Sequence, residues 1–185
     1  MEKQKIVAGF HSGHDCSFGI LVDGIPVVHA ELERYIRLKE PIDDSLKFLF
    51  DKYDNFENIS DFTTGIDLWY GGTENRYPDS WNQAQKISSN NGGKIHTFGH
   101  HQCHAANSFF SSNIQEALII TIDGGGEEID LNGRIVNANF TVWLGKDNKI
   151  QKVDILSENG LNNSTNIGGF WSKCTEEIFG LSAGY

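Results

Sequence analysis

Two histidines spaced four residues apart are the sharpest chemical feature of this 185-residue sequence. His100 and His104 lie in the segment HHQCHAANSFF, which is predicted to be a helix. Residues four apart share one face of a helix, so both imidazoles can reach one ion, and neutral imidazole suits iron, zinc and related metals. The alternative is coincidence, since seven histidines in one chain will sometimes fall four apart. Spacing alone leaves both interpretations open.

A metal held by two histidines needs a third ligand, and Asp123 is well placed to supply it. It follows the continuous apolar run at 117–122, which predicts a strand buried on both faces. Ligands bind beyond the carboxyl ends of strands in open α/β sheets. Two histidines and one carboxylate would also leave coordination positions open for substrate. We therefore predict a metal site formed by His100, His104 and Asp123.

Three glycines, Gly124, Gly125 and Gly126, follow the candidate aspartate directly. Successive glycines allow backbone N–H groups to approach and surround a phosphate, so we assign these residues to a bound nucleotide. The alternative is an ordinary glycine turn. Glu127 and Glu128 come next and would repel phosphate unless a cation intervenes, which favours a nucleotide bridged by a metal.

A polar loop, HSGHDCS at residues 11–17, joins the first two predicted strands. His14 is the candidate general base, because an unperturbed imidazole has a pKa of about 6.5. Asp15 and Ser17 of the same loop are assigned to the nucleotide, Ser17 through phosphate. The alternative is a solvated β-turn, which the loop composition by itself favours.

A local basic cluster at residues 34–39 stands out in an acidic chain. Arg34 and Lys39 are assigned to the nucleotide, since guanidinium and ammonium groups bind phosphate. The alternative is a surface stretch in which Glu31 and Glu33 pair with these cations. The sequence pattern alone favours that alternative.

The bulk composition limits the class of protein. A hydrophobic share of 38% over 185 residues is enough for one domain or one lobe. The formal net charge of −10 argues against a nucleic-acid partner or an anionic membrane surface. Three widely spaced cysteines imply no disulfide framework, and no apolar run reaches the roughly 18 residues that cross a bilayer. Without a recognisable secretory signal, we expect a cytoplasmic protein.

The predicted elements form an α/β lobe. Strands at 5–10, 16–22 and 25–30 make an N-terminal β-meander, with a hairpin turn at the Asp23-Gly24 pair. A helix at 45–53 follows, capped by Asp43 or Asp44. This order is typical of a ribonuclease-H or actin-like ATPase fold, with a mixed sheet flanked by helices. The remaining predictions are strands at 62–66, 94–98, 138–145 and 152–157, helices at 81–87, 100–110 and 168–179, and loops at 70–78 and 159–166. In the last helix, Phe170, Trp171, Cys174 and Ile178 are expected to point inward.

Five blocks of the sequence, in their order, resemble one family. They are HDCSFGILVDG at 14–24, ELERYIRLK at 31–39, HHQCHAANSFF at 100–110, IDGGGE at 122–127 and FWSKCTEEIFGLSAG at 170–184. The chain is similar to the carbamoyltransferases that include the nodulation-factor and antibiotic O-carbamoyltransferases. The resemblance spans nearly the whole chain apart from roughly residues 40–97.

The resemblance implies a two-stage reaction. A separate domain of such enzymes makes carbamoyl-adenylate from carbamoyl phosphate and ATP, and the actin-like domain passes the carbamoyl group to an acceptor hydroxyl of a small molecule or sugar. The implied metal is ferrous iron, and His100, His104 and Asp123 match its ligands. His14 matches the loop histidine, the base for the acceptor hydroxyl.

The family pattern also implies that more protein belongs with this chain. In the family, the last block continues into a glycine- and lysine-rich segment, a second lobe and the adenylate-forming domain. We therefore interpret residues 1–185 as the N-terminal lobe of the actin-like domain, with the rest of the enzyme elsewhere. Alone, this lobe is expected to bind metal weakly and to have little or no activity.

Three other classes share some of these features. The tRNA threonylcarbamoyl-transfer proteins share the two-histidine helix, but a tRNA partner fits poorly with a charge of −10. Non-haem iron oxygenases also use two histidines and a carboxylate, usually from a β-barrel. A non-catalytic nucleotide- or metal-binding module is the third. Binding of metal together with adenine nucleotide would separate the carbamoyltransferase from the other classes.

Overall fold

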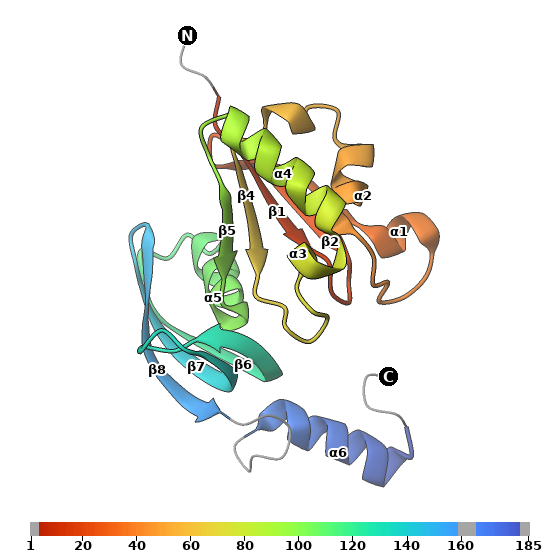
Figure 1. The fold of residues 1–185 in the computed structure, drawn as a ribbon. Helices are drawn as coiled ribbons and strands as arrows, with labels where there is room; N and C mark the ends of the chain where they lie inside the picture. Colours follow the sequence, from red (N-terminus) through yellow and green to blue (C-terminus); the bar gives the residue numbers. More distant parts are fainter. Residues whose placement is uncertain (1–3, 159–165, 182–185) are drawn as a thin grey trace. The chain divides into compact units, whose positions relative to one another are not determined.

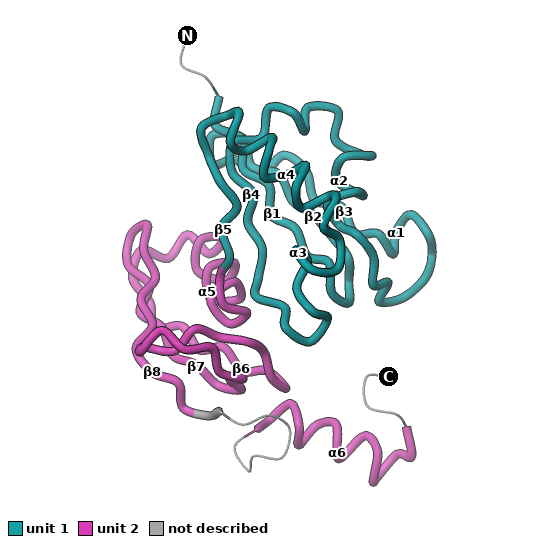
Figure 2. Tube along the Cα trace, in the orientation of Figure 1, with its two compact units in different colours: residues 1–97 teal, residues 98–185 magenta. Residues whose placement is uncertain are grey.

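The computed structural model describes residues 4–158 and 166–181. The chain forms two compact units, residues 1–97 (unit 1) and residues 98–185 (unit 2), coloured separately in Figure 2. It is a mixed α/β protein, with a five-stranded mixed sheet and a separate three-stranded antiparallel sheet. Among the described residues, no helix has the length and apolar character needed to cross a bilayer. The predicted loop at 159–166 lies outside the described residues except for Asn166.

The sheet of unit 1 has the strand order β3-β2-β1-β4-β5 (Figure 1). Strand β1 pairs antiparallel with β2 and parallel with β4, and β2 pairs antiparallel with β3. The helices α2 and α4 pack against this sheet. The elements of unit 1 are β1 (Ile6–His11), β2 (Ser17–Val22), β3 (Ile25–Glu31), α1 (Leu32–Ile36), α2 (Ser45–Lys52), a 3-10 turn (Phe56–Asn58), β4 (Asp61–Gly65), α3 (Thr73–Arg76), α4 (Pro78–Asn90) and β5 (Ile95–Phe98).

Local sequence signals account for much of unit 1. Asp23 and Gly24 both have positive φ, as the hairpin turn between β2 and β3 requires. Asp44 caps α2, since its side chain accepts hydrogen bonds from the backbone N–H groups of Leu46 and Lys47. Two expectations were wrong: α4 is longer than the predicted helix, and the predicted loop at 70–78 contains the short helix α3. Pro78 at the first position of α4 favours that earlier start.

The core of unit 1 follows from alternation along its strands. Ile6, Ala8 and Phe10 are buried on β1, and Phe62 is fully buried on β4. Helix α2 contributes Leu46, which is also fully buried. The four strand residues lie on one face of the sheet, as period-two alternation requires, and Leu46 packs in the same core cluster. The result is a sheet with a buried apolar face, and the polar loop that contains His14 joins the ends of β1 and β2.

Unit 2 is built on a long antiparallel sheet of order β6-β7-β8. Helix α5 covers one face, where Ala105, Phe109, Ile119 and Trp143 form a small buried cluster. The bounds of α5 agree with the predicted helix at 100–110. The elements of unit 2 are α5 (His100–Phe110), β6 (Glu116–Ile129), β7 (Ile135–Lys146), β8 (Lys149–Glu158) and α6 (Ile167–Phe179).

Strand β6 corrects the prediction of a short strand buried on both faces. It is 14 residues long, and Leu118, Ile120 and Ile122 are 64%, 52% and 48% exposed. Only alternate residues such as Ile119 and Thr121 face α5. The sheet is antiparallel, so the expectation of a ligand site at the end of a parallel strand does not explain Asp123 here.

Helix α6 has the predicted extent but not the predicted burial. It ends at Gly180, which is left-handed with φ +64°. Phe170, Trp171 and Ile178, expected to point inward, are 68%, 75% and 70% exposed. The helix contacts β6, where a Cβ on Gly168 would lie 2.4 Å from the backbone of Gly124. Despite this contact, much of the apolar surface of the helix is exposed.

Candidate metal centre

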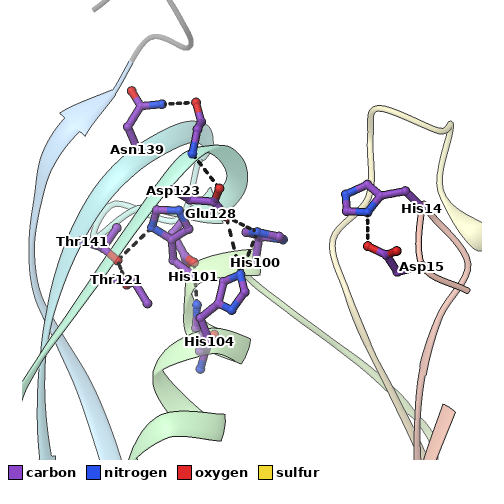
Figure 3. Close-up of polar contacts among 12 residues, drawn as sticks. His14, Asp15, His100, His101, His104, Thr121, Asp123, Glu128, Asn139 and Thr141 are labelled. Atoms are coloured by element: carbon purple, nitrogen blue, oxygen red, sulfur yellow. Dashed lines mark hydrogen bonds and ion pairs between the residues drawn. The ribbon is translucent and has the colours of Figure 1, made fainter. Parts of the chain in front are cut away.

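His100, His104 and Asp123 converge in unit 2 (Figure 3). The Nε2 atom of His100 lies 2.9 Å from Oδ2 of Asp123, and Nε2 of His104 lies 3.5 Å from the same oxygen. The two Nε2 atoms are 3.1 Å apart. One donor atom from each residue therefore lies within 4.8 Å of the others.

These spacings are those that a shared cation requires. Two donors that each lie about 2.1 Å from a metal, at tetrahedral to octahedral angles, are separated by about 3.0–3.4 Å. Each imidazole directs Nε2 into the gap, and a carboxylate oxygen completes it. Two ring nitrogens that face each other at 3.1 Å cannot both carry a proton without repulsion, whereas both can donate lone pairs to one cation. The residues present therefore fit a divalent metal.

The electrostatics of the cluster favour an ionised carboxylate. Hydrogen bonds from His100 first, and then His104, hold the pKa of Asp123 well below its usual range, although burial opposes the shift. The side chains of His100 and Asp123 are 31% and 38% exposed and that of His104 is 54% exposed. Asp123 is thus available as an anionic ligand at neutral pH, on a surface that solvent can reach.

Asp123 is positioned by a bulge inside β6 rather than by a loop after a strand. The pairing with β7 shifts register between Ile122 and Gly126. The Gly124 N–H donates to Asp123 Oδ1 at 2.6 Å, and the Gly124 carbonyl accepts hydrogen bonds from Asn139 and Asn166, each at 2.9 Å. The glycine run therefore holds the carboxylate in place. Its predicted contact with phosphate stays a prediction.

The histidine pair is held on the sheet by its neighbours. The ring of His100 lies against Gly126, where an added Cβ would come within 2.3 Å of it. Next to it, His101 is fully buried, and its Nδ1 lies 3.0 Å from the hydroxyl of Thr141, which also accepts a hydrogen bond from Trp143 Nε1 at 2.9 Å. Burial first, and then the nearby His100, lower the pKa of His101 to about 4, so it anchors α5 as a neutral ring.

His14 lies in unit 1, on the loop between β1 and β2. Its Nδ1 is 2.6 Å from Oδ2 of Asp15, which leaves Nε2 free for a proton when Nδ1 is the donor. Both side chains are more than half exposed. The loop is anchored by Ser12, whose hydroxyl lies 2.5 Å from that of buried Ser45 at the start of α2. The predicted role of His14 as a general base stays a prediction.

A cavity of about 170 Å³ lies in unit 1 beyond the carboxyl end of β4. Asp67 connects it with the His14 loop, because Gly13 has room only for a hydrogen between Asp67 and His11. Two carboxylates and no cation lie among the residues that line it, which disfavours an anionic occupant. The lining residues are Thr64, Gly65, Ile66, Asp67, Leu68, Gly72, Thr73, Glu74, Trp81 and Thr97.

The other predicted nucleotide contacts lie in unit 1. Ser17 begins β2 and is partly buried. The guanidinium of Arg34 pairs with Glu31 at 2.9 Å, and Lys39 pairs with Glu33 at 3.5 Å. Arg34 and Lys39 are thus arranged as in the surface alternative, and their binding of phosphate stays a prediction.

The sequence patterns did not assign a supporting role at the metal cluster to three polar residues. Asn139 and Asn166 fix the Gly124 carbonyl, and Glu128 binds the start of α5. One signal for Glu128 was available: Gly99 precedes the helix and has no side chain to cap it, so the cap had to come from elsewhere.

Comparison with known proteins shows that the fold of this chain is similar to part of two solved structures. No model of a known protein family matches the chain, and no curated protein matches it. One solved structure that it resembles is full-length HypF in the phosphate- and nucleotide-bound form, with a TM-score of 0.52, 9% identity, and coverage of 83% of this chain and 22% of that one. HypF of T. kodakarensis gives a TM-score of 0.53 and 14% identity, with coverage of 83% of this chain and 18% of that one. The chain therefore spans only a small part of the proteins it matches.

Proposed function

We propose that this chain is part of an O-carbamoyltransferase, which moves a carbamoyl group from carbamoyl-adenylate to an acceptor hydroxyl. The observation that carries the proposal is the convergence of His100, His104 and Asp123, with donor atoms within 4.8 Å of one another. A helix supplies both imidazoles and a glycine bulge supplies the carboxylate. This combination supports a divalent metal, which we propose to be ferrous iron.

The fold supports the same class of reaction. HypF, whose solved structures the chain resembles, is a carbamoyltransferase, and one of those structures holds phosphate and nucleotide. The strand order β3-β2-β1-β4-β5, with an antiparallel meander followed by a parallel strand, supports an assignment of unit 1 to the ribonuclease-H and actin-like class. We propose that carbamoyl phosphate supplies the carbamoyl group and ATP supplies the adenylate, and that the remainder of such an enzyme carries out the adenylate-forming step.

The proposed chemistry assigns a role to each group. His100, His104 and Asp123 would hold the metal, which when bound supplies positive charge near the phosphate of the leaving nucleotide. His14 accepts the proton of the acceptor hydroxyl as its oxygen bonds to the carbamoyl carbon. The bond from that carbon to the phosphate oxygen breaks, and AMP leaves. Asp15 keeps the His14 ring oriented through its contact with Nδ1.

The cavity in unit 1 supports a neutral or cationic acceptor. Asp67 and Glu74 line it and would repel a phosphorylated or carboxylated molecule. Its threonine hydroxyls and Trp81 offer hydrogen bonds and an aromatic surface. A sugar or amino sugar fits this chemistry, and the cavity volume of about 170 Å³ suits one ring or a similar group.

Anaerobic titration with Fe(II), in the presence and absence of a non-hydrolysable ATP analogue, tests the proposal by calorimetry. We expect one metal per chain, with an affinity reduced at least about tenfold in His104→Ala and Asp123→Asn. Metal and nucleotide should strengthen each other's binding by the same factor, because binding linkage is reciprocal. His29→Ala, which removes an exposed histidine on β3, is the matched control.

Three results would redirect the proposal. Nucleotide binding without metal would indicate a simple nucleotide-binding module. Binding of 2-oxoglutarate with iron would favour an oxygenase. A wild-type chain that binds no divalent metal, or binds it equally well without His104 and Asp123, would refute the metal centre.

A further inference from the structure

Glu128 is a buried carboxylate that joins three elements of unit 2. It has no exposed surface. Its Oε1 accepts a hydrogen bond from Nζ of Lys152, on β8, at 2.6 Å, and its Oε2 accepts one from the backbone N–H of Gln102, on α5, at 2.9 Å. Lys152 is itself 10% exposed and lies over the ring of Trp143 at 4.9 Å. The Glu128 side chain therefore connects β6 and β8 with the start of α5. Figure 3 shows Glu128 beside the histidines.

Helix α5 needs this contact because it has no cap of its own. The first backbone N–H groups of a helix lack intrahelical partners, and Gly99 at the cap position has no side chain to bind them. A Cβ on Gly99 would lie only 2.1 Å from Oε1 of Glu128. The glycine thus leaves the space that the carboxylate fills, and Glu128 serves as a cap supplied by the neighbouring strand.

The position of this cap connects it with the metal cluster. Gln102 lies between His100 and His104, so a fixed Gln102 N–H fixes the axial position and rotation of the turn that carries both imidazoles. Asp123 and Glu128 are on the same strand, on either side of the Gly126 position that contacts His100. One strand therefore supplies the carboxylate of the cluster and also the contact that aligns the two histidines with it.

A gain in folding stability does not by itself explain the buried ion pair between Glu128 and Lys152. Desolvation of two charges opposes their attraction, and apolar residues of similar volume often stabilise a protein as well or better. What a hydrogen-bonded buried pair supplies is a fixed geometry, because few other arrangements satisfy both charges. Outer groups of this kind orient metal ligands in many proteins.

We propose that Glu128, held by Lys152, is a positioning residue that sets the geometry of His100 and His104 relative to Asp123 and thereby the affinity for the metal. This inference rests on the proposed metal centre. It also makes a second claim that needs no metal. Among the described residues, Glu128 is the acceptor that protects the Gln102 N–H from hydrogen exchange.

Co(II), whose visible spectrum reports ligand geometry, is the probe for the first claim. The full chain is titrated as wild type, Glu128→Ala, and the double variant Glu128→Gln with Lys152→Met, which keeps an acceptor for Gln102 in a neutral pair. We expect Glu128→Ala to weaken Co(II) binding by about 10-fold or more and to alter the spectrum, and the double variant to recover to within about threefold of wild type. Glu116→Gln is the matched control, since Glu116 forms an exposed pair with Lys146 at the other end of β6.

Hydrogen exchange of the metal-free chain tests the second claim. Protection of the Gln102 amide should fall at least about 10-fold in Glu128→Ala and stay unchanged in Glu116→Gln. If Glu128→Ala does not fold cooperatively, the double variant Glu128→Leu with Lys152→Met takes its place in both measurements, because it removes the acceptor for the Gln102 N–H without leaving a buried charge unpaired. A folded variant without the acceptor at position 128 that binds Co(II) with wild-type affinity and spectrum would overturn the positioning role. A wild-type chain that binds no Co(II) would refute the proposed metal centre instead. Unchanged protection of the Gln102 amide in the variant without the acceptor would refute the claim that Glu128 caps α5.

Discussion

Single side chains in this protein work through networks that connect distant parts of the sequence. Asp61 shows this in unit 1: its carboxylate lies 3.0 Å from Nε2 of His96 and 3.4 Å from Nζ of Lys5. Burial by itself would raise the pKa of Asp61, but hydrogen bonds from His96, the Lys94 backbone and Lys5 lower it. The ionised form therefore ties the start of β1 to β5.

A depressed pKa in the folded chain makes Asp61 a source of pH-dependent stability. Its contribution is complete above the unfolded value of about 3.9 and is lost as the pH falls through the lower folded value. Asp61→Asn should cost about 1–2 kcal/mol at pH 7, and the difference from wild type should shrink below pH 4. Urea unfolding at pH 7, 4 and 3 measures this. The exposed Asp51→Asn is the control, and a constant difference at all pH values would contradict the prediction.

A second side-chain network, in unit 2, is anchored by Thr141. Its hydroxyl lies 3.0 Å from Nδ1 of His101 and 2.5 Å from the hydroxyl of Thr121. Thr141→Val would leave a buried imidazole with no partner among these residues, and should destabilise the chain by about 1–3 kcal/mol. Thermal unfolding without metal tests this. Thr63→Val, which removes only a 3.4 Å contact with the Ala8 carbonyl, should cost much less.

Elements meet at glycines wherever the metal cluster is assembled. Helix α5 approaches β6 at Gly99 and Gly126, and the start of α6 approaches Gly124 through Gly168. At each point a larger residue would displace a neighbour. The glycine run after Asp123 is therefore needed for close packing between elements, whatever its part in phosphate binding.

Gly126→Ala tests that close packing. The added Cβ would lie 2.3 Å from the His100 ring, so the ring must turn or the helix must shift. We expect a loss of about 1–3 kcal/mol in stability and a fall in Fe(II) affinity of about 10-fold or more. Gly19→Ala on β2, whose Cβ would meet an ordinary contact at 3.6 Å, should leave metal binding unchanged. Wild-type metal affinity in Gly126→Ala would contradict the packing argument.

The whole molecule leaves a large apolar surface uncovered in unit 2. Three cross-strand pairs lie on the face of the sheet opposite α5: Leu118 with Leu144, Ile120 with Val142, and Ile122 with Phe140. Leu118 and Ile120 are 64% and 52% exposed. Adjacent apolar pairs on an exposed sheet promote association in solution.

Self-association of the chain should therefore depend on this face. Light scattering during gel filtration should show a mass that rises with protein concentration. Ile120→Glu should shift the onset to a concentration higher by about 5-fold or more, since it places a charge at the centre of the apolar face. Ile25→Glu, which changes an exposed apolar residue of unit 1 away from this face, should have little effect. A wild type that stays monomeric at every concentration would refute the prediction.

Sequence patterns alone determined the features that depend on near neighbours. The bounds of α5, the turn at Asp23 and Gly24, and a cap of α2 by Asp43 or Asp44 follow from local chemistry, since each uses contacts within a few residues. The structure shows that the cap is Asp44. The spacing of His100 and His104 likewise fixed a shared helix face. The tertiary structure brings Asp123 to that face, and the metal itself stays a prediction.

Only the tertiary structure decided what depends on contacts between distant segments. The extent and one-sided exposure of β6, the uncovered face of α6 and the cap supplied by Glu128 depend on which elements meet. Apolar periodicity reveals that a surface is suited to burial but does not reveal what covers it. A buried charge such as Glu128 carries no local signal either, because its partners Gln102 and Lys152 are each more than 20 residues away in the sequence.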